Sequence, residues 1–268
     1  MPEGPEVKII AESLAENISG LYLHSYEILS GRYKKKGDPS GFSTLSNLLP
    51  LRIIGAGCHG KFIFIILEDN SSIWCTLGMT GGWKQELDSH SRVKFCTSGR
   101  DFYFSDVRNF GTLKFTQLKQ DLISKLESLG PDMLSDDVDG EIFSERIKRK
   151  KRKTIVEALM DQSIIAGVGN YLKSESLYYA KISPHRTCDS LSAEELIKLN
   201  KAIKTVIRAS YLSGGATINS YSDFNGKIGE YSRRFAVYNQ ESDPEGRKVL
   251  KEKTKDQRST FWVPEFQS

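Results

Sequence analysis

The chain of 268 residues lacks the marks of a zinc-binding, secreted or membrane-spanning protein. Its four cysteines form no CxxC pair, and no two of them stand at a zinc-ligand spacing with the four histidines. No run of eighteen or more apolar residues is present, so no transmembrane helix is expected. The N-terminus lacks the basic segment and apolar core of a signal peptide. These absences predict an intracellular protein with reduced cysteines, without a bound metal, a cofactor or a membrane partner.

Charge and size set few further limits. A hydrophobic content of 38% and a charged content of 27% are typical of globular proteins. The net charge of +4 permits a polyanionic partner without demanding one. The length fits one large or two ordinary domains.

The first six residues, Met-Pro-Glu-Gly-Pro-Glu, carry the most specific chemistry. Met1 is normally removed before a small residue, which would leave Pro2 with a free secondary amine. An α-amino group titrates near pH ~8, and its unprotonated form attacks electrophilic carbon. The carboxylates of Glu3 and Glu6 lie within reach for proton transfer. By itself the hexapeptide favours a plainer interpretation, the start of a helix, where proline and acidic residues are common.

The first half of the chain reads as one helix followed by short strands. Apolar residues recur at helical spacing from Val7 to Ile18, and Gly20 is a plausible stop. Short apolar runs then alternate with turn residues, including 68–70 and 98–100, which indicates an antiparallel sandwich or barrel. The runs are Leu21–Leu29, Phe62–Leu67, Ile73–Leu77, Arg92–Cys96, Phe102–Phe104 and Thr112–Phe115.

The second half reads as helical. An acidic stretch ending in the basic run 148–153 is interpreted as a linker, and the run as solvated or phosphate-facing rather than an import signal. A helix beginning at Ile155 leads to Gly167-Val168-Gly169-Asn170, where Asn170 is predicted to cap a second helix up to Ala180 and to leave N–H groups for a phosphate.

Two further elements complete the second half. A capping box of Ser192 and Glu195 starts a third helix. Phe235–Tyr238 and Thr260–Val263 are predicted to pair as a terminal hairpin.

Nine short motifs, in their order and spacing, resemble the formamidopyrimidine/endonuclease VIII DNA glycosylases over essentially the whole chain. The resemblance implies an α+β fold: an N-terminal antiparallel β-sandwich with a flanking helix (1–131), a linker (132–153), a helix–two-turn–helix domain (154–232) and a β-hairpin finger (233–268). The motifs are Pro2–Glu6, His59–Lys61, Leu77–Gly81, Asp106–Gly111, Leu129–Asp132, Met160–Gln162, Gly167–Asn170 with Glu175, Val237–Tyr238 and Arg258–Phe261.

The family's chemistry can be transferred to matching positions. The resemblance implies that Pro2 attacks C1′ of a damaged nucleotide and expels the base, and that the resulting Schiff base undergoes β,δ-elimination. Glu3 would protonate the sugar oxygen, and Glu6 would line the same pocket. Lys61 would face the phosphates and the reacting sugar.

The DNA contacts follow from the same resemblance. The damaged nucleotide leaves the helix at a cost of a few kcal/mol. Met79, Arg108 and Phe110 would fill the gap, with Arg108 hydrogen-bonding to the orphaned base. Asn170 would bind a phosphate at the damaged site, and Glu175 belongs to the same DNA-binding motif.

The C-terminal finger departs from the zinc-bearing members. Glu245, Lys248, Val263 and Phe266 occupy the places of the four cysteine ligands, which resembles the zincless-finger branch. Arg258 keeps the position of the finger arginine that contacts a phosphate. Buried apolar side chains must then hold the hairpin, at roughly 1.5–3 kcal/mol for each fully buried one. The candidates are Phe261, Trp262, Val263 and Phe266.

The substrate is less sharply indicated. Gly4 is typical of the endonuclease VIII branch, whereas the complete set of Met79, Arg108 and Phe110 is typical of the formamidopyrimidine branch; the loop 220–230 matches neither. The prediction is excision of oxidised pyrimidines and ring-opened purines, cleavage of abasic sites, and poorer action on 8-oxoguanine. The partner would be double-stranded DNA carrying such lesions, bound by a monomer in the nucleus or cytoplasm.

Three alternatives stay open. One is a glycosylase that prefers 8-oxoguanine and formamidopyrimidines. Another is a non-catalytic protein that binds damaged DNA, although retention of Pro2 and Glu3 argues against it. A third is an enzyme that uses an N-terminal proline on small substrates, which leaves the basic, helical second half unexplained.

Overall fold

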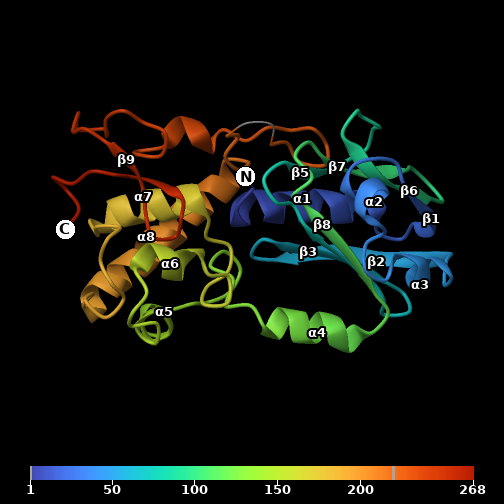
Figure 1. Cartoon of the computed structure of the whole chain (residues 1–268), viewed down its shortest axis with the longest axis horizontal. Coiled ribbons are helices and arrows are strands. Elements are labelled where there is room, and N and C mark those ends of the chain that lie inside the picture. Colours follow the sequence, from blue (N-terminus) through green and yellow to red (C-terminus); the bar gives the residue numbers. More distant parts are fainter. Residues whose placement is uncertain (1, 219–220) are drawn as a thin grey trace. The chain divides into compact units, whose positions relative to one another are not determined.

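The computed structural model describes residues 2–218 and 221–268 and separates the chain into two compact units (Figure 1). The first unit contains Pro2 and residues 6–128 and 214–229, and the second contains residues 3–5, 129–213 and 230–268. Met1, whose removal is predicted, and Ser220, in the loop 220–230, lie outside the described residues. None of the described helices is both long and apolar enough to cross a bilayer.

The first unit is built on an antiparallel β-sandwich, as predicted. Its eight strands follow the order β5-β7-β6-β1-β2-β3-β4-β8, and β1 and β2 share only a short pairing, Tyr22 with Arg52 and Leu23 with Leu51. The strand bounds are β1 Tyr22–Ile28, β2 Leu51–His59, β3 Phe62–Leu67, β4 Ser72–Thr76, β5 Gly81–Lys84, β6 Ser91–Thr97, β7 Phe102–Asp106 and β8 Thr112–Thr116.

Helix α1 (Gly4–Ile18) contributes one wall of the sandwich core. The predicted apolar positions from Val7 to Ile18 are buried together with strand residues such as Trp83 and Phe95. Gly20 follows the helix with φ of +85°, a conformation that favours glycine, so the predicted stop is confirmed. Three further helices belong to this unit: α2 (Arg32–Lys36), α3 (Phe42–Ser46) and α4 (Lys119–Glu127).

The second unit is helical. Helix α6 (Ile155–Met160) begins with a capping box of Thr154 and Glu157 and ends earlier than predicted, because Asp161 leaves the helical conformation. Helix α7 (Asn170–Ala180) packs against α8 (Ala193–Leu212), which begins at the predicted capping box of Ser192 and Glu195.

The segment 132–153, interpreted above as a linker, contains helix α5 (Gly140–Lys148). Asp139 caps it by accepting from the backbone N–H of Ile142, and Phe143 and Ile147 are fully buried. Because α5 packs against α8 inside the second unit, this segment is folded and is not an unstructured connection. The boundaries at 131, 153 and 232 stay a prediction.

The terminal hairpin uses a different first strand from the predicted one. Strand β9 (Leu250–Lys253) pairs with β10 (Ser259–Trp262). The segment 235–238 follows a 3-10 helix, η1 (Tyr231–Arg234), and forms no strand. Its backbone N–H groups at 236–238 donate to the Glu175 carboxylate, which leaves them unavailable to a neighbouring strand.

Candidate active site

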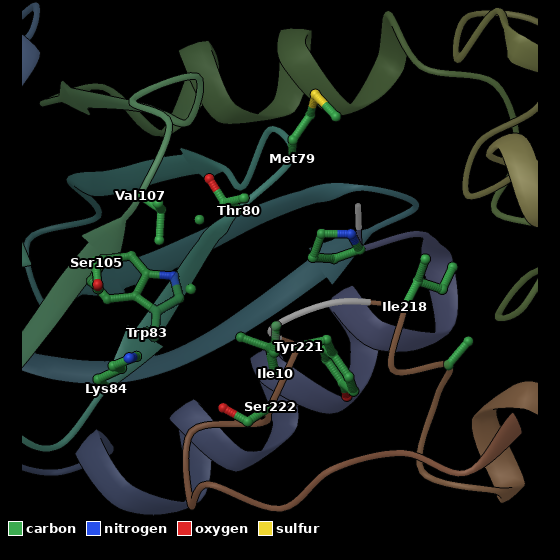
Figure 2. A pocket seen from close by; sticks show the side chains of 14 residues that line it. Ile10, Met79, Thr80, Trp83, Lys84, Ser105, Val107, Ile218, Tyr221 and Ser222 are labelled. Carbon is green, nitrogen blue, oxygen red and sulfur yellow. The ribbon is translucent and has the colours of Figure 1, made fainter. Parts of the chain in front are cut away.

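Pro2 lines a cavity of the first unit (Figure 2). The cavity measures about 70 Å³. Its wall combines the apolar side chains of Ile10 and Trp83 with the polar ones of Thr80 and Ser222. A group held there would meet the Pro2 ring in surroundings that are partly apolar.

Tyr221 lines the same cavity (Figure 2). Its hydroxyl is buried without a hydrogen-bond partner among the residues that the structure describes. Burial raises the pKa of Tyr221, and the carboxylates of Glu6 and Asp223 raise it further. The hydroxyl therefore stays protonated at neutral pH and keeps a hydrogen to donate.

Glu6 fixes the start of the loop that bounds the cavity. Its side chain is buried, and Oε1 accepts a hydrogen bond from the backbone N–H of Ala216 at 2.7 Å. Gly215 has φ of +89°, and a Cβ there would lie 3.0 Å from the Glu6 carboxylate. Because Ala216 and Ile218 both line the cavity, Glu6 anchors part of its wall.

Glu3 is buried in the second unit at the start of α7. Its Oε1 accepts from the backbone N–H of Tyr171 at 2.8 Å, and its Oε2 from that of Leu172 at 3.2 Å. The positive end of the helix favours the ionised carboxylate. Glu3 therefore takes the N–H groups of Tyr171 and Leu172, so these two do not face a phosphate, whereas a phosphate contact of the first N–H, that of Asn170, stays a prediction. Gly169 leaves the room this requires, since a Cβ there would collide with the carboxyl group.

Lys61 lies in a tight hairpin turn of the first unit. Gly60 and Lys61 connect β2 to β3, where His59 pairs with Phe62. Gly60 adopts φ of +58°, as two-residue hairpin turns require. The Lys61 side chain is half-buried, and its contact with phosphate stays a prediction.

Met79, Arg108 and Phe110 lie on two neighbouring loops of the first unit. Met79 is 36% exposed and Phe110 53% exposed, which is unusual for large apolar side chains. One guanidinium nitrogen of Arg108 lies 3.3 Å from the Met79 sulfur, and the guanidinium carbon lies 4.9 Å from the centre of the Phe110 ring. The three side chains therefore form one exposed group.

The buried Asp106 carboxylate accepts hydrogen bonds from both loops. Its side chain is 1% exposed; Oδ1 accepts from the Thr80 hydroxyl at 2.6 Å and from the backbone N–H of Arg108 at 3.2 Å. Its Oδ2 accepts from the backbone N–H of Gly111 at 2.7 Å. One carboxylate thus holds both the segment around Met79 and the segment around Arg108.

Asn170 connects α7 to the finger. It was predicted to cap α7, but it is the first residue of the helix and Gly169 precedes it as the cap. Its Nδ2 donates to the backbone oxygen of Ser259 at 2.9 Å. The neighbouring Arg258 is exposed and able to meet an anion.

Glu175, predicted as part of the DNA-binding motif, is fully buried and supports that motif from within the second unit. Burial raises the pKa of Glu175, and the backbone N–H groups of Ala236, Val237 and Tyr238, at 2.8 to 2.9 Å, oppose that rise. Its role is to fix the chain that leads into the finger.

The finger is held by apolar and ionic contacts. Val263 and Phe261 are buried in a cluster with Tyr178, Ala236, Val237 and Val249. Phe266 is contacted by two cations, with Arg247 at 3.8 Å and Lys181 at 4.6 Å from its ring centre. These residues do not fit a zinc site, and the described part of the chain has no group of three or more His, Cys, Asp or Glu placed to hold a metal ion.

Domain families and relatives decide the assignment. The formamidopyrimidine-DNA glycosylase N-terminal domain matches residues 1–113, its H2TH domain residues 129–222 and its C-terminal domain residues 227–268. A formamidopyrimidine-DNA glycosylase of Prochlorococcus marinus is 34% identical over the whole of both chains. The chain belongs to the formamidopyrimidine-DNA glycosylase family. Another such glycosylase, of Herpetosiphon aurantiacus, is 32% identical over 91% of this chain and 90% of its own.

Solved structures of this family have the same fold. The MutM (Fpg) protein of Thermus thermophilus superposes with a TM-score of 0.87 and 31% identity, covering 99% of this chain and 98% of its own. A Lactococcus lactis FPG mutant in complex with Fapy-dG containing DNA gives 0.88 and 26% identity over the whole of both chains. As a member of this family, the protein is a DNA glycosylase of base excision repair with abasic-site lyase activity.

Two residues of the site were missed from the sequence. Asp106 stands inside a family motif, and its place between two glycine-containing loops is the signal that was available. Tyr221 carries no such signal, because its burial depends on α1 and the sandwich core, which are remote in sequence.

Proposed function

We propose that the protein excises ring-opened purines and oxidised pyrimidines from double-stranded DNA, with Pro2 as the nucleophile, and that it also cleaves abasic sites. The observation that carries the proposal is the cavity at Pro2, which, once Met1 is removed, would combine an N-terminal amine with a buried Tyr221 hydroxyl that has no hydrogen-bond partner among the described residues. Its family membership supports the same reaction class.

The proposed reaction begins when the unprotonated Pro2 nitrogen attacks C1′. The nitrogen–C1′ bond forms as the glycosidic bond breaks, and the base leaves with its electron pair and takes a proton from solvent. Glu3 takes the proton that the Pro2 nitrogen loses and passes it to the ring oxygen as the sugar opens, which yields an iminium. Loss of a C2′ proton then expels the 3′ phosphate, and a second elimination expels the 5′ phosphate. Water finally hydrolyses the adduct and releases Pro2.

The surrounding cations and exposed side chains support binding of a distorted duplex. Lys61 would neutralise phosphate charge near the sugar, and Asn170 and Arg258 would bind the backbone. Met79, Arg108 and Phe110 already touch one another on exposed loops, and such a group suits replacement of an extruded nucleotide.

The substrate class is supported by two observations. Relatives are named for formamidopyrimidine, and solved relatives hold Fapy-dG containing DNA. The neutral Tyr221 hydroxyl suits a base that presents a carbonyl or formamido oxygen, which ring-opened purines and oxidised pyrimidines do.

Borohydride trapping tests the nucleophile. The protein with a native N-terminus should form a covalent adduct with an oligonucleotide carrying a ring-opened purine. A version with a short extension before Pro2 should form none, whereas the same extension placed at the C-terminus should leave trapping intact. Equal trapping by both extended proteins would exclude Pro2 as the nucleophile.

A panel of lesions tests the substrate. Excision rates are compared for ring-opened guanine, thymine glycol, guanidinohydantoin and 8-oxoguanine in one sequence context. The proposal expects 8-oxoguanine to be slowest, and a fastest rate on 8-oxoguanine would favour the alternative preference. Intact strands with every lesion, despite salt-sensitive binding, would indicate a non-catalytic binding protein.

A further inference from the structure

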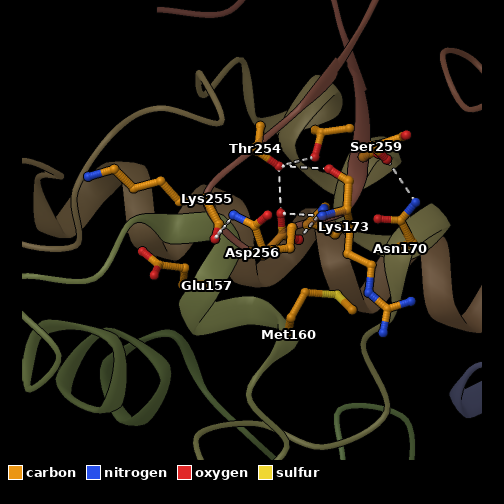
Figure 3. Close-up of polar contacts among 12 residues, drawn as sticks. Glu157, Met160, Asn170, Lys173, Thr254, Lys255, Asp256 and Ser259 are labelled. Atoms are coloured by element: carbon orange, nitrogen blue, oxygen red, sulfur yellow. Dashed lines mark hydrogen bonds and ion pairs between the residues drawn. The ribbon is translucent and has the colours of Figure 1, made fainter.

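The second unit contains an ion pair that is almost completely removed from solvent. Lys173 of α7 and Asp256 of the β9–β10 turn meet at 2.5 Å, and their side chains are 0% and 3% exposed (Figure 3). Burying two charges costs several kcal/mol for each ion before their attraction offsets it, so such a pair is weak evidence for stability alone. The position of the pair, between α7 and the turn that carries Arg258, indicates a role beyond stability.

Asp256 organises the turn that carries Arg258. Its Oδ2 accepts from Lys173, while its Oδ1 accepts from the Thr254 hydroxyl at 2.6 Å and from the backbone N–H of Arg258 at 3.3 Å. The backbone N–H of Thr254 donates to the Arg258 oxygen at 3.1 Å, which closes the turn. Asp256 therefore links the Arg258 backbone directly to α7.

Helix α7 holds this turn on both sides of Arg258. Asn170 binds the backbone oxygen of Ser259, directly after Arg258, and Lys173 binds Asp256, two residues before it (Figure 3). Asn170 and Lys173 are three residues apart, so they share one face of the helix. The Arg258 backbone is thereby clamped between two contacts from one rigid element.

The charges around Lys173 fit the same arrangement. Burial lowers the pKa of Lys173, and the carboxylates of Asp256 and Glu3 oppose that change. Glu3 is itself fixed on the first N–H groups of α7. Lys173 therefore lies close to three parts of the proposed site. They are Glu3, which is proposed to protonate the sugar, the turn that contains Asp256, and Arg258, which is proposed to bind phosphate.

We propose that Lys173 and Asp256 are positioning residues for Arg258, and that their buried pair sets the orientation of a finger that has no metal ligands. The inference rests on the proposed function, in which Arg258 contacts a phosphate beside the lesion. The pair would lower the reorganisation needed when DNA binds, because the arginine backbone is already fixed.

The test uses the combined variant Lys173→Met with Asp256→Asn. It leaves no unpaired buried charge, and the asparagine oxygen keeps the bonds to Thr254 and Arg258, so the turn survives while its link to α7 is lost. Excision of a ring-opened purine should fall about 10-fold or more in kcat/KM, since small misplacements near the chemistry are costly. Strand cleavage at a preformed abasic site should change less than about 3-fold.

The matched control makes the same substitutions in an exposed pair of the second unit, Lys204→Met with Asp137→Asn, whose partners lie 3.5 Å apart. This control should leave both activities unchanged, because exposed pairs contribute little.

A double-mutant cycle separates positioning from general destabilisation. In the Arg258→Ala background, the Lys173/Asp256 substitutions should lower excision by less than about 2-fold, since residues acting through one group are not additive. A full additive loss there, or no loss in the wild-type background, would overturn the inference. If the wild-type protein excises no lesion, the proposed function fails instead, so the two failures are distinguishable.

Discussion

The Arg108 guanidinium lies 3.3 Å from the Met79 sulfur, which joins two loops that are 29 residues apart in the chain. Phe110 stacks beside the same guanidinium, and the Asp106 carboxylate beneath holds both loops. The three exposed side chains and the buried Asp106 therefore form one connected group. Replacing the buried residue and replacing an exposed one should have different effects on stability and activity.

Replacing the anchor should damage stability and activity together. Asp106→Ala leaves the Thr80 hydroxyl and the Gly111 N–H without this acceptor and leaves the Arg108 N–H only its bond to the Thr80 hydroxyl, so we expect a loss of about 3 kcal/mol in the free energy of unfolding. Urea unfolding measures it. Thr80→Val removes the hydroxyl bond to Asp106 and the bond from the Arg108 N–H to that hydroxyl, but it keeps both backbone bonds to Asp106 and should cost about 1 kcal/mol. Equal effects of the two variants would mean that Asp106 does not carry both loops.

Replacing an exposed member should spare stability and lower excision from duplex DNA. Phe110→Ala removes a ring that would offset lost stacking of a few kcal/mol, so single-turnover excision should fall by about 10- to 100-fold. Cleavage of a single-stranded abasic oligonucleotide should change little, because no gap needs filling. Ile54→Ala, at an exposed apolar residue of β2, is the control and should match wild type. Parallel losses on both substrates would contradict the gap-filling role.

Asp88 should make stability depend on pH in the acid range. Burial alone would raise its pKa, but hydrogen bonds from Lys84, Ser105, Ser91 and the His90 backbone outweigh this and lower it to about 2. A native pKa below the unfolded one means that the native state binds fewer protons, so the contribution is complete above about pH 5 and is lost as pH falls toward 2.

The Asp88→Asn variant measures that contribution. Because the side chain is partly exposed, we expect a difference from wild type of about 1 kcal/mol at pH 7. Urea unfolding between pH 7 and pH 3 should show the difference shrinking below about pH 4. A difference that stays constant across this range would disprove the assignment to the Asp88 carboxylate.

Metal removal should leave the finger intact. The resemblance implies that Glu245, Lys248, Val263 and Phe266 replace the cysteines of a zinc finger, and Val263 and Phe266 pack in the apolar cluster of the finger. Elemental analysis should find no stoichiometric zinc, and a chelator should leave the melting temperature and excision rate unchanged. One zinc per chain would contradict the structural account of the finger.

The sequence pattern predicted those helices and strands whose formation depends on residues close together in the chain. Helix α8 was predictable because its capping box and apolar face are contiguous. Helix α5 carried similar signals, Asp139 as cap and Phe143 and Ile147 one turn apart, and was missed because its acidic surroundings resembled a linker. Strands β5 and β9 have sequences with a weak preference for strand, Gly-Gly-Trp-Lys and Leu-Lys-Glu-Lys. They form because they pair with neighbouring strands.

The site divides in the same way. The residues with proposed roles in chemistry could be predicted because they stand in short motifs, from Pro2 to Arg258. Their supporting contacts could not, since Glu3 meets Tyr171 across 168 residues and Lys173 meets Asp256 across 83. A lysine in Asn-Tyr-Leu-Lys-Ser-Glu looks like a surface residue until the fold supplies its partner.

Gly169 has a consequence for mutational scanning. Its φ of −128° suits any residue, yet a methyl group there would occupy the space of the Glu3 carboxyl group. In a saturation-mutagenesis map its tolerance profile should therefore cluster with that of Glu3, because a side chain at either position decides whether the Glu3 carboxylate keeps its place at the start of α7.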